Sequence, residues 1–112
     1  MSMRFWKQII NLQDQFYPDW RKQKPRTLFS TALAGECGEM CGVVTHLDGG
    51  GTNTTRYTEE MILEEAADIY IQLVLLLEKS AFTETDFERA LISKFAVLHH
   101  RLKEKGGLKR NE

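Results

Sequence analysis

The sequence predicts an all-α fold, a bundle of four antiparallel helices that assembles as a homo-oligomer. Apolar residues recur at helical spacing in four separate segments, and no segment reads convincingly as a strand. Proline and glycine-rich stretches fall between these segments, where they end helices. We therefore expect a single all-α domain over residues 1–105, followed by a flexible C-terminal tail over residues 106–112.

The first two helices are separated by a short basic stretch. The first is expected over Met3–Tyr17, and Pro18 ends it because proline cannot continue a helix. Residues 20–26 are expected to form a basic connector, and the second helix follows over Thr27–Leu47. The first helix carries one apolar stripe, made of Phe5, Ile9, Leu12 and Phe16.

The last two helices follow a polar, glycine-rich loop over Asp48–Tyr57. This loop has neither the lysine nor the preceding strand of a phosphate-binding glycine loop, so we expect a mobile connection. The third helix is expected over Thr58–Lys79. The fourth is expected over Thr85–Lys105, because the segment from Thr85 to Glu88 fits a capping box.

Composition excludes several classes of protein. The 112 residues carry a net charge of −1, which argues against a nucleic-acid polymer as partner. The longest apolar run, Ile69–Leu77, is too short to span a membrane, and the N-terminus lacks the apolar core of a signal peptide. Cys37 and Cys41 are read as reduced thiols, because a disulfide within one helix is geometrically awkward, and zinc is not expected because further ligands at metal spacing are missing. A cytoplasmic protein without a membrane partner is expected.

Acidic pairs at helical spacing are the main functional signal. Glu36 and Glu39 share one side of the second helix and border its apolar face, and Glu65 and Asp68 repeat this on the third helix. Antiparallel packing would bring four carboxylates together, which raises their pKa values unless a cation binds between them. Carboxylate oxygens favour Mg²⁺, Mn²⁺ or Ca²⁺, whereas a di-iron site would need Glu-x-x-His motifs. The competing interpretation is ordinary solvent-facing glutamates.

Two further features concern the partners of these helices. The third helix is apolar over most of its circumference, which predicts cover on more than one side and hence a homo-oligomer. In the fourth helix, Lys94 and Arg101 lie within an apolar stripe. They either turn outward or pair with the carboxylates, or they hold phosphate oxygens together with the metal.

These motifs, taken in order, resemble a known family. The segments "LAGECGEM" and "EEAADIYIQLVLLL", followed by Lys94 and Arg101, are similar to the all-α NTP pyrophosphatases of the MazG-like superfamily. The resemblance covers roughly Pro25 to Arg101. Gly35 stands where MazG proper has a glutamate, so the dCTP pyrophosphatase-like branch is favoured.

The resemblance implies an enzyme that acts as a homodimer or homotetramer. It would hydrolyse nucleoside triphosphates, (d)NTPs, between the α and β phosphates to the monophosphate and pyrophosphate, as house-cleaning of unwanted nucleotides. By position, Lys94 and Arg101 would contact phosphate. The same resemblance implies that Mg²⁺, with Mn²⁺ as a substitute, binds to four ligands: Glu36, Glu39, Glu65 and Asp68.

Several roles remain open at the level of sequence. Glu36 or Glu39 would activate the water, and the neighbouring glycines would admit either a triphosphate or another helix. Trp20 and His46 are the candidates to hold the base, while Trp6 is expected in the core. Leu98 stands where the branch usually has asparagine. The alternative function is a non-catalytic nucleotide-binding or helical regulatory protein that keeps the fold.

Overall fold

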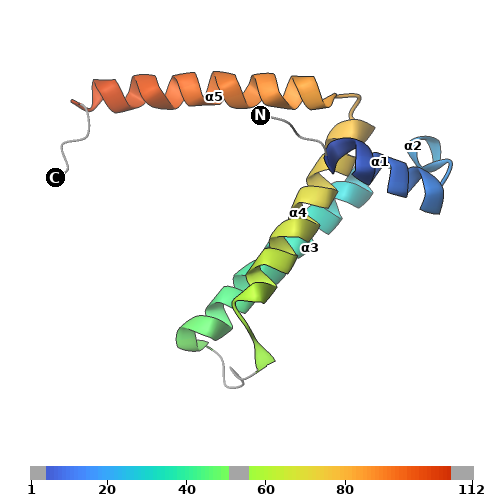
Figure 1. Ribbon diagram of the computed structural model, residues 1–112, viewed down its shortest axis with the longest axis horizontal. Helices are drawn as coiled ribbons and strands as arrows, with labels where there is room; N and C mark the ends of the chain where they lie inside the picture. Colours follow the sequence, from blue (N-terminus) through green and yellow to red (C-terminus); the bar gives the residue numbers. More distant parts are fainter. Residues whose placement is uncertain (1–4, 51–55, 107–112) are drawn as a thin grey trace. The chain divides into compact units, whose positions relative to one another are not determined.

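The structure is a computed structural model that describes residues 5–50 and 56–106 (Figure 1). Every element among these residues is helical, which confirms the all-α class, while the four-helix bundle and the homo-oligomer stay predictions. Parts of the expected glycine loop and of the C-terminal tail lie outside the described residues. The elements are α1 (Phe5–Phe16), α2 (Trp20–Gln23), α3 (Arg26–Thr45), η1 (His46–Gly50), α4 (Glu60–Lys79) and α5 (Glu84–Glu104).

The chain divides into two compact units, of which the first ends at Ala81 and the second begins at Phe82. The first unit holds α1 to α4 and the second holds α5. The single domain expected over residues 1–105 stays a prediction. The carboxylate pairs singled out from the sequence both belong to the first unit, so the fold of that unit positions them.

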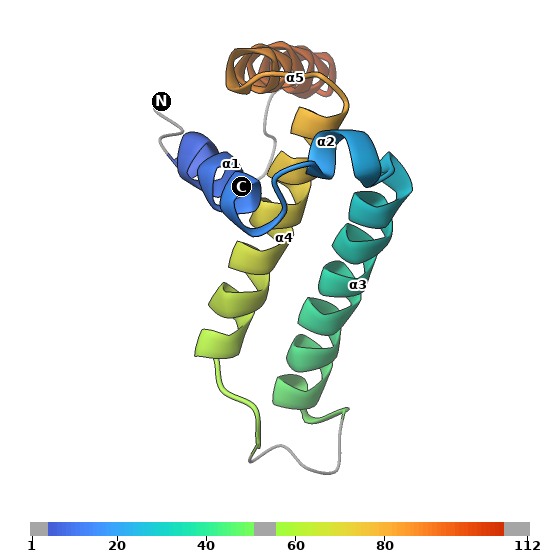
Figure 2. The same ribbon diagram turned by 90° about the vertical axis from the view of Figure 1, so that its right-hand side faces the viewer.

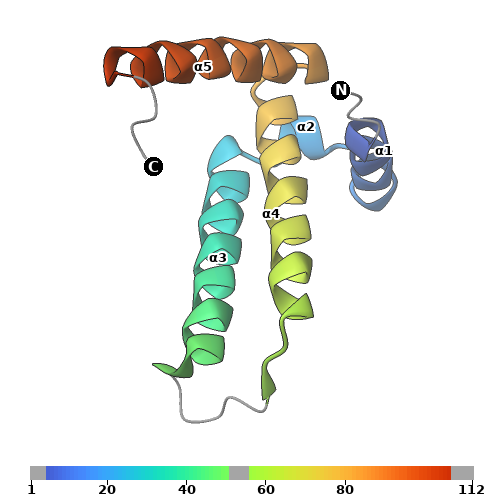
Figure 3. The same cartoon turned by 60° about the vertical axis from the view of Figure 1, so that its left-hand side comes forward.

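The centre of the first unit is an antiparallel pair of long helices, α3 and α4, which run side by side in opposite directions (Figures 2 and 3). Each has 20 residues. Most of the buried side chains lie where α3 and α4 meet α1 and α2, at one end of the pair, and Val43 is buried between the helices near the end of α3. The buried apolar residues are Trp6, Ile10, Trp20, Phe29, Val43, Val74 and Leu75.

Helix α1 turns a different face inward than its apolar stripe suggests. Trp6, as expected, lies in the core with 5% of its surface exposed, and Ile10 lies beside it. Phe5 and Phe16, both from the stripe, are 53% and 74% exposed. The reason is the indole of Trp6, which is the larger apolar group and whose Nε1–H donates to Glu78 Oε1 at 3.2 Å.

The expectation of a plain connector after α1 is wrong, because residues 20–23 form the short helix α2. Its first residue, Trp20, is 1% exposed and anchors the segment. The indole Nε1–H donates to Asp14 Oδ1 at 2.8 Å, and the ring meets Phe29 edge-on at a centroid distance of 5.5 Å. Burying this one large side chain holds the turn of helix in place.

The helix ends differ from the expected ones by a few residues. Helix α3 continues into the wider turn η1, which Gly49 ends with a φ of +90°, a conformation that glycine adopts without strain. The expected capping box at Thr85 is wrong, since Thr83 caps α5 instead. The Thr83 hydroxyl accepts from the Asp86 N–H at 3.1 Å, and Asp86 Oδ2 accepts from the Thr83 N–H at 2.9 Å.

Within the described ranges, none of the helices is long and apolar enough to cross a membrane. The cytoplasmic location stays a prediction.

Candidate metal centre

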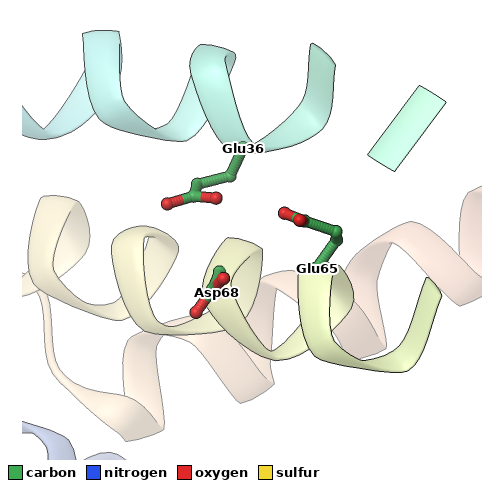
Figure 4. Close-up of side chains that lie close together, drawn as sticks. All are labelled: Glu36, Glu65 and Asp68. Carbon is green, nitrogen blue, oxygen red and sulfur yellow. The ribbon is translucent and has the colours of Figure 1, made fainter. Parts of the chain in front are cut away.

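Three carboxylates meet between α3 and α4. Glu36 comes from α3, and Glu65 and Asp68 come from successive turns of α4. One oxygen atom from each side chain lies within 4.8 Å of the other two (Figure 4). The i, i+3 spacing sets Glu65 and Asp68 on one face of α4, and the antiparallel packing of the pair turns that face toward Glu36. We call these three residues the acidic cluster.

The acidic cluster is partly withdrawn from water. Glu36 and Glu65 are half-buried, and Glu65 Oε1 is buried with no hydrogen-bond partner. Partial burial raises the pKa of the Glu36 carboxyl above its ordinary value, and Glu39 and the charge of Asp68 raise it further. Partial burial likewise raises the pKa of Glu65, with the charges of Glu39 and Asp68 as the next causes.

Glu39, the fourth predicted ligand, lies beside the acidic cluster rather than within its closest group. Its side chain is exposed, yet it is near enough to raise the pKa of both Glu36 and Glu65. The structure therefore brings all four predicted carboxylates to one place, with three oxygens in the tightest arrangement and the fourth carboxylate at the edge.

The acidic cluster has the donor chemistry of a divalent cation site. Among the described residues of the first unit, no lysine or arginine forms an ion pair with Glu36, Glu65 or Asp68. Several anionic oxygens that converge without a counter-charge, one of them buried and unpaired, fit a hard cation such as Mg²⁺ or Mn²⁺. The residues present thus suit the ion that the sequence predicts.

The glycines next to the acidic cluster face open space. A Cβ atom built on Gly35, Gly38 or Gly42 meets no atom of the described chain within 4 Å. No helix of the described first unit packs against this edge of α3, so close helix packing within the unit does not explain the glycines. Free room beside carboxylates leaves space for a ligand or for a second molecule.

Of the predicted base-holding residues, one is buried and the other is stacked. Trp20 lies in the core between Phe29 and Arg21, whose guanidinium carbon is 4.8 Å from the ring centroid. This burial is at odds with the base-binding role expected for Trp20, because neither face of its indole is free. His46 stacks on Tyr57 with ring centroids 4.2 Å apart and an angle of 4° between the planes.

Sequence reasoning missed Tyr57. In the sequence, Tyr57 is only the last residue of the glycine-rich loop. The usable signal was that two aromatic rings, His46 and Tyr57, flank this loop on either side. The His46 ring also has a buried Nδ1 with no partner. This stacked pair lies where α3 ends and the approach to α4 begins.

The remaining predicted site residues lie on α5, in the second unit. Lys94 and Arg101 are both exposed and lie seven residues apart, two helical turns, so they share one face of α5. Their contact with phosphate stays a prediction. Cys37 and Cys41 are exposed free thiols on α3.

Comparisons of the chain with protein-family models, with curated proteins and with solved structures find no match. The resemblance to the MazG-like pyrophosphatases therefore remains a prediction from the sequence motifs.

Proposed function

We propose that this protein is a Mg²⁺-dependent nucleotide pyrophosphohydrolase that converts (d)NTPs to the monophosphate and pyrophosphate. The observation that carries the proposal is the acidic cluster, in which oxygens from two facing helices converge within 4.8 Å. The pKa values of Glu36 and Glu65 are raised first by partial burial and then by the neighbouring carboxylates, which supports a site where negative charge lacks a counter-charge. A bound divalent cation would supply that counter-charge.

In this proposal the acidic cluster and Glu39 hold Mg²⁺, and Mn²⁺ can replace it. Bound to the triphosphate, the ion would neutralise phosphate charge and favour attack of water on the α-phosphorus. Glu36 or Glu39 orients that water and accepts its proton, since both lie on the face of α3 that is bordered by glycine. Lys94 and Arg101 are the residues of α5 that we propose to contact phosphate.

The open glycine edge supports a large anionic substrate. Space next to Gly35 and Gly38 lets a triphosphate reach the backbone of α3 without meeting a side chain. The exposed apolar surface of α4 supports the predicted homodimer or homotetramer, because Leu63 is 72% and Ile71 38% exposed in the single chain. House-cleaning of unwanted dNTPs is the role that we propose for this activity.

The test is a product analysis with a panel of dNTPs and NTPs in Mg²⁺, followed by phosphorus NMR or ion-exchange separation. Monophosphate plus pyrophosphate supports the proposal, and Glu39→Gln should abolish that turnover while the far-ultraviolet circular dichroism stays that of the parent. Diphosphate plus orthophosphate contradicts the bond assignment. Silence across the panel, with stabilisation by nucleotide, would favour the non-catalytic alternative.

A further inference from the structure

A pocket of about 250 Å³ opens on the first unit beside the acidic cluster. Ala32 of α3 lines it and lies four residues before Glu36, while Gln72 of α4 lines it and lies four residues after Asp68. Four residues are one helical turn, so the helix faces that carry the acidic cluster continue directly into the pocket. A ligand held by the carboxylates can extend into the pocket without crossing a helix.

The pocket has an apolar floor and four polar side chains, those of Gln13, Tyr17, Lys24 and Gln72. Leu28, Phe29 and Leu75 supply the floor. Gln13 and Gln72 contribute side-chain amides, each of which can donate and accept hydrogen bonds. Lys24 contributes an ammonium that only donates, and its Nζ lies 4.3 Å from the ring centroid of Tyr17, another lining residue. An apolar cavity with a few converging polar groups is typical of a small-molecule site.

The volume limits what the pocket can hold. It is smaller than the cavities of roughly 300–1,000 Å³ that enclose a whole drug-sized ligand. A nucleobase is smaller than this volume, so the pocket can hold the base while the sugar and the phosphates lie outside it.

We propose that this pocket holds the base of the substrate and that Lys24 selects 4-oxo pyrimidines, uracil or thymine, over cytosine. This inference rests on the proposed function. With the phosphates at the acidic cluster, the sugar spans the intervening helical turn and places the base between Gln13 and Gln72. The ammonium of Lys24 can donate to the carbonyl oxygen at position 4. Cytosine presents an amino group there, and two donors face each other without a bond.

The experiment compares kcat/KM for dUTP and dCTP in the wild type and in Lys24→Met, which keeps an apolar stem but removes the donor. We expect dUTP to be favoured on the order of tenfold, equivalent to about 1.4 kcal/mol, with the ratio falling to near one in Lys24→Met. Lys22→Met, an exposed change on α2 outside the pocket, is the matched control and should keep the ratio. Equal kcat/KM values in the wild type would overturn the proposal.

Two further measurements separate this proposal from the proposed function. If Lys24→Met slows dUTP, dCTP and inorganic tripolyphosphate by the same factor, Lys24 acts on phosphate and the base assignment is wrong. Titration of ¹⁵N-labelled protein with dUMP should shift the side-chain amide signals of Gln13 and Gln72 more than dCMP does. If these shifts occur but no nucleotide is hydrolysed, the base pocket is supported and the proposed hydrolase function is wrong. If dUTP is hydrolysed but the signals do not shift, the hydrolase function is supported and the base pocket is wrong.

Discussion

The first unit gathers acidic side chains at two places on α4, and their surroundings differ. The acidic cluster holds only negative groups. About 15 Å further along α4, by the rise of a helix, Glu78 belongs to a group that we call the Arg21 clamp, made of Asp14, Arg21 and Glu78. There Arg21 Nη1 donates to Asp14 Oδ1 at 2.9 Å and Nη2 donates to Glu78 Oε2 at 3.2 Å.

Two indole N–H groups also donate hydrogen bonds to the carboxylates of the Arg21 clamp. Trp20 Nε1–H donates to Asp14 and Trp6 Nε1–H donates to Glu78, so each carboxylate has two donors. The ammonium of Lys79 donates to the backbone carbonyl of Arg21 and ties α2 to the end of α4. The chain thus pairs its carboxylates where they join helices, and it leaves the acidic cluster with excess negative charge. That difference supports the proposed cation site between α3 and α4.

The largest expected effect separates the two regions by activity. Glu65→Gln keeps the shape of the side chain but removes one charge from the acidic cluster, so Mg²⁺-dependent turnover should fall on the order of 100-fold or more. The free energy of unfolding in EDTA should stay the same or rise, because the new amide can donate to a neighbouring carboxylate. Initial-rate kinetics and urea unfolding measure the two quantities.

The matched control for that variant is Glu64→Gln, an exposed glutamate one residue earlier that is not part of the acidic cluster. It removes the same charge from the chain and should leave turnover unchanged. An equal loss in both variants would mean that total charge matters rather than the position of Glu65, and the contrast between cluster and clamp would lose its functional meaning.

Breaking the Arg21 clamp should have the opposite profile. Arg21→Met keeps part of the stem over Trp20 but leaves Asp14 and Glu78 without their shared cation. Because Arg21 and Asp14 are each 44% exposed, solvent weakens the interaction, and we expect a loss of about 1 kcal/mol in the free energy of unfolding. Lys22→Met should cost less, and kcat should change little in either variant. A loss of kcat in Arg21→Met that exceeds its loss of stability would place the clamp in the active site.

A smaller effect tests the open edge of α3. Gly38→Ala meets nothing within 4 Å, so the variant should gain roughly 0.5–1 kcal/mol of stability from better helix propensity. If a triphosphate or a second molecule approaches this edge, the added methyl group should raise KM or weaken the assembly. Thermal unfolding, steady-state kinetics and analytical ultracentrifugation together decide this. A variant that is more stable, equally active and equally assembled would show that the glycine has no partner.

Helical periodicity was enough to predict the class and the faces of the acidic cluster. It placed Glu65 and Asp68 on one side of α4 and Glu36 on the facing side of α3, because i, i+3 spacing is a local property. It could not distinguish Glu36 from Glu39, since the residue that comes closest depends on the register between two helices. That register is set by packing around buried residues such as Phe29 and Val74.

The errors arose where two local patterns competed or where contacts were distant. Thr83 and Thr85 are both followed three residues later by an acidic residue, so either fits a capping box, and the backbone of the whole turn decides for Thr83. The sequence offered Trp20 as a residue to hold the base, but its contacts with Asp14 and Phe29 bury it in the core. The stacking of Tyr57 on His46 joins the two ends of the loop, so the aromatic residue hints at it but the contact itself depends on how α3 and α4 pack.

The pH dependence of stability gives the smallest effect, and its sign differs between the two regions. The pKa values of Glu36 and Glu65 are raised above their ordinary value of 4.5, so above that value the folded protein holds protons that the unfolded chain has released. The contribution of the acidic cluster to the unfolding free energy therefore rises as the pH falls through this window. The pKa of Asp14 is lowered from 3.8, chiefly by the Trp20 donor and also by Arg21, so the contribution of the clamp is complete above 3.8 and is lost below it.

Urea unfolding in EDTA between pH 7 and pH 3 measures both trends as differences between variants. The stability that Glu65→Gln gains over wild type should shrink as the pH drops toward 4.5, because protonation of the acidic cluster in wild type relieves the same repulsion. Asp14→Asn should be the less stable variant at pH 7 and approach wild type below 3.8, where the wild-type carboxylate is itself protonated. Mg²⁺ at pH 7 should stabilise wild type but not Glu65→Gln by mass action, and that gain should fade on acidification as protons compete for the same oxygens. Parallel pH curves for the two variants would mean that the two regions do not differ in how they hold negative charge, and the main physical argument for a cation between α3 and α4 would be gone.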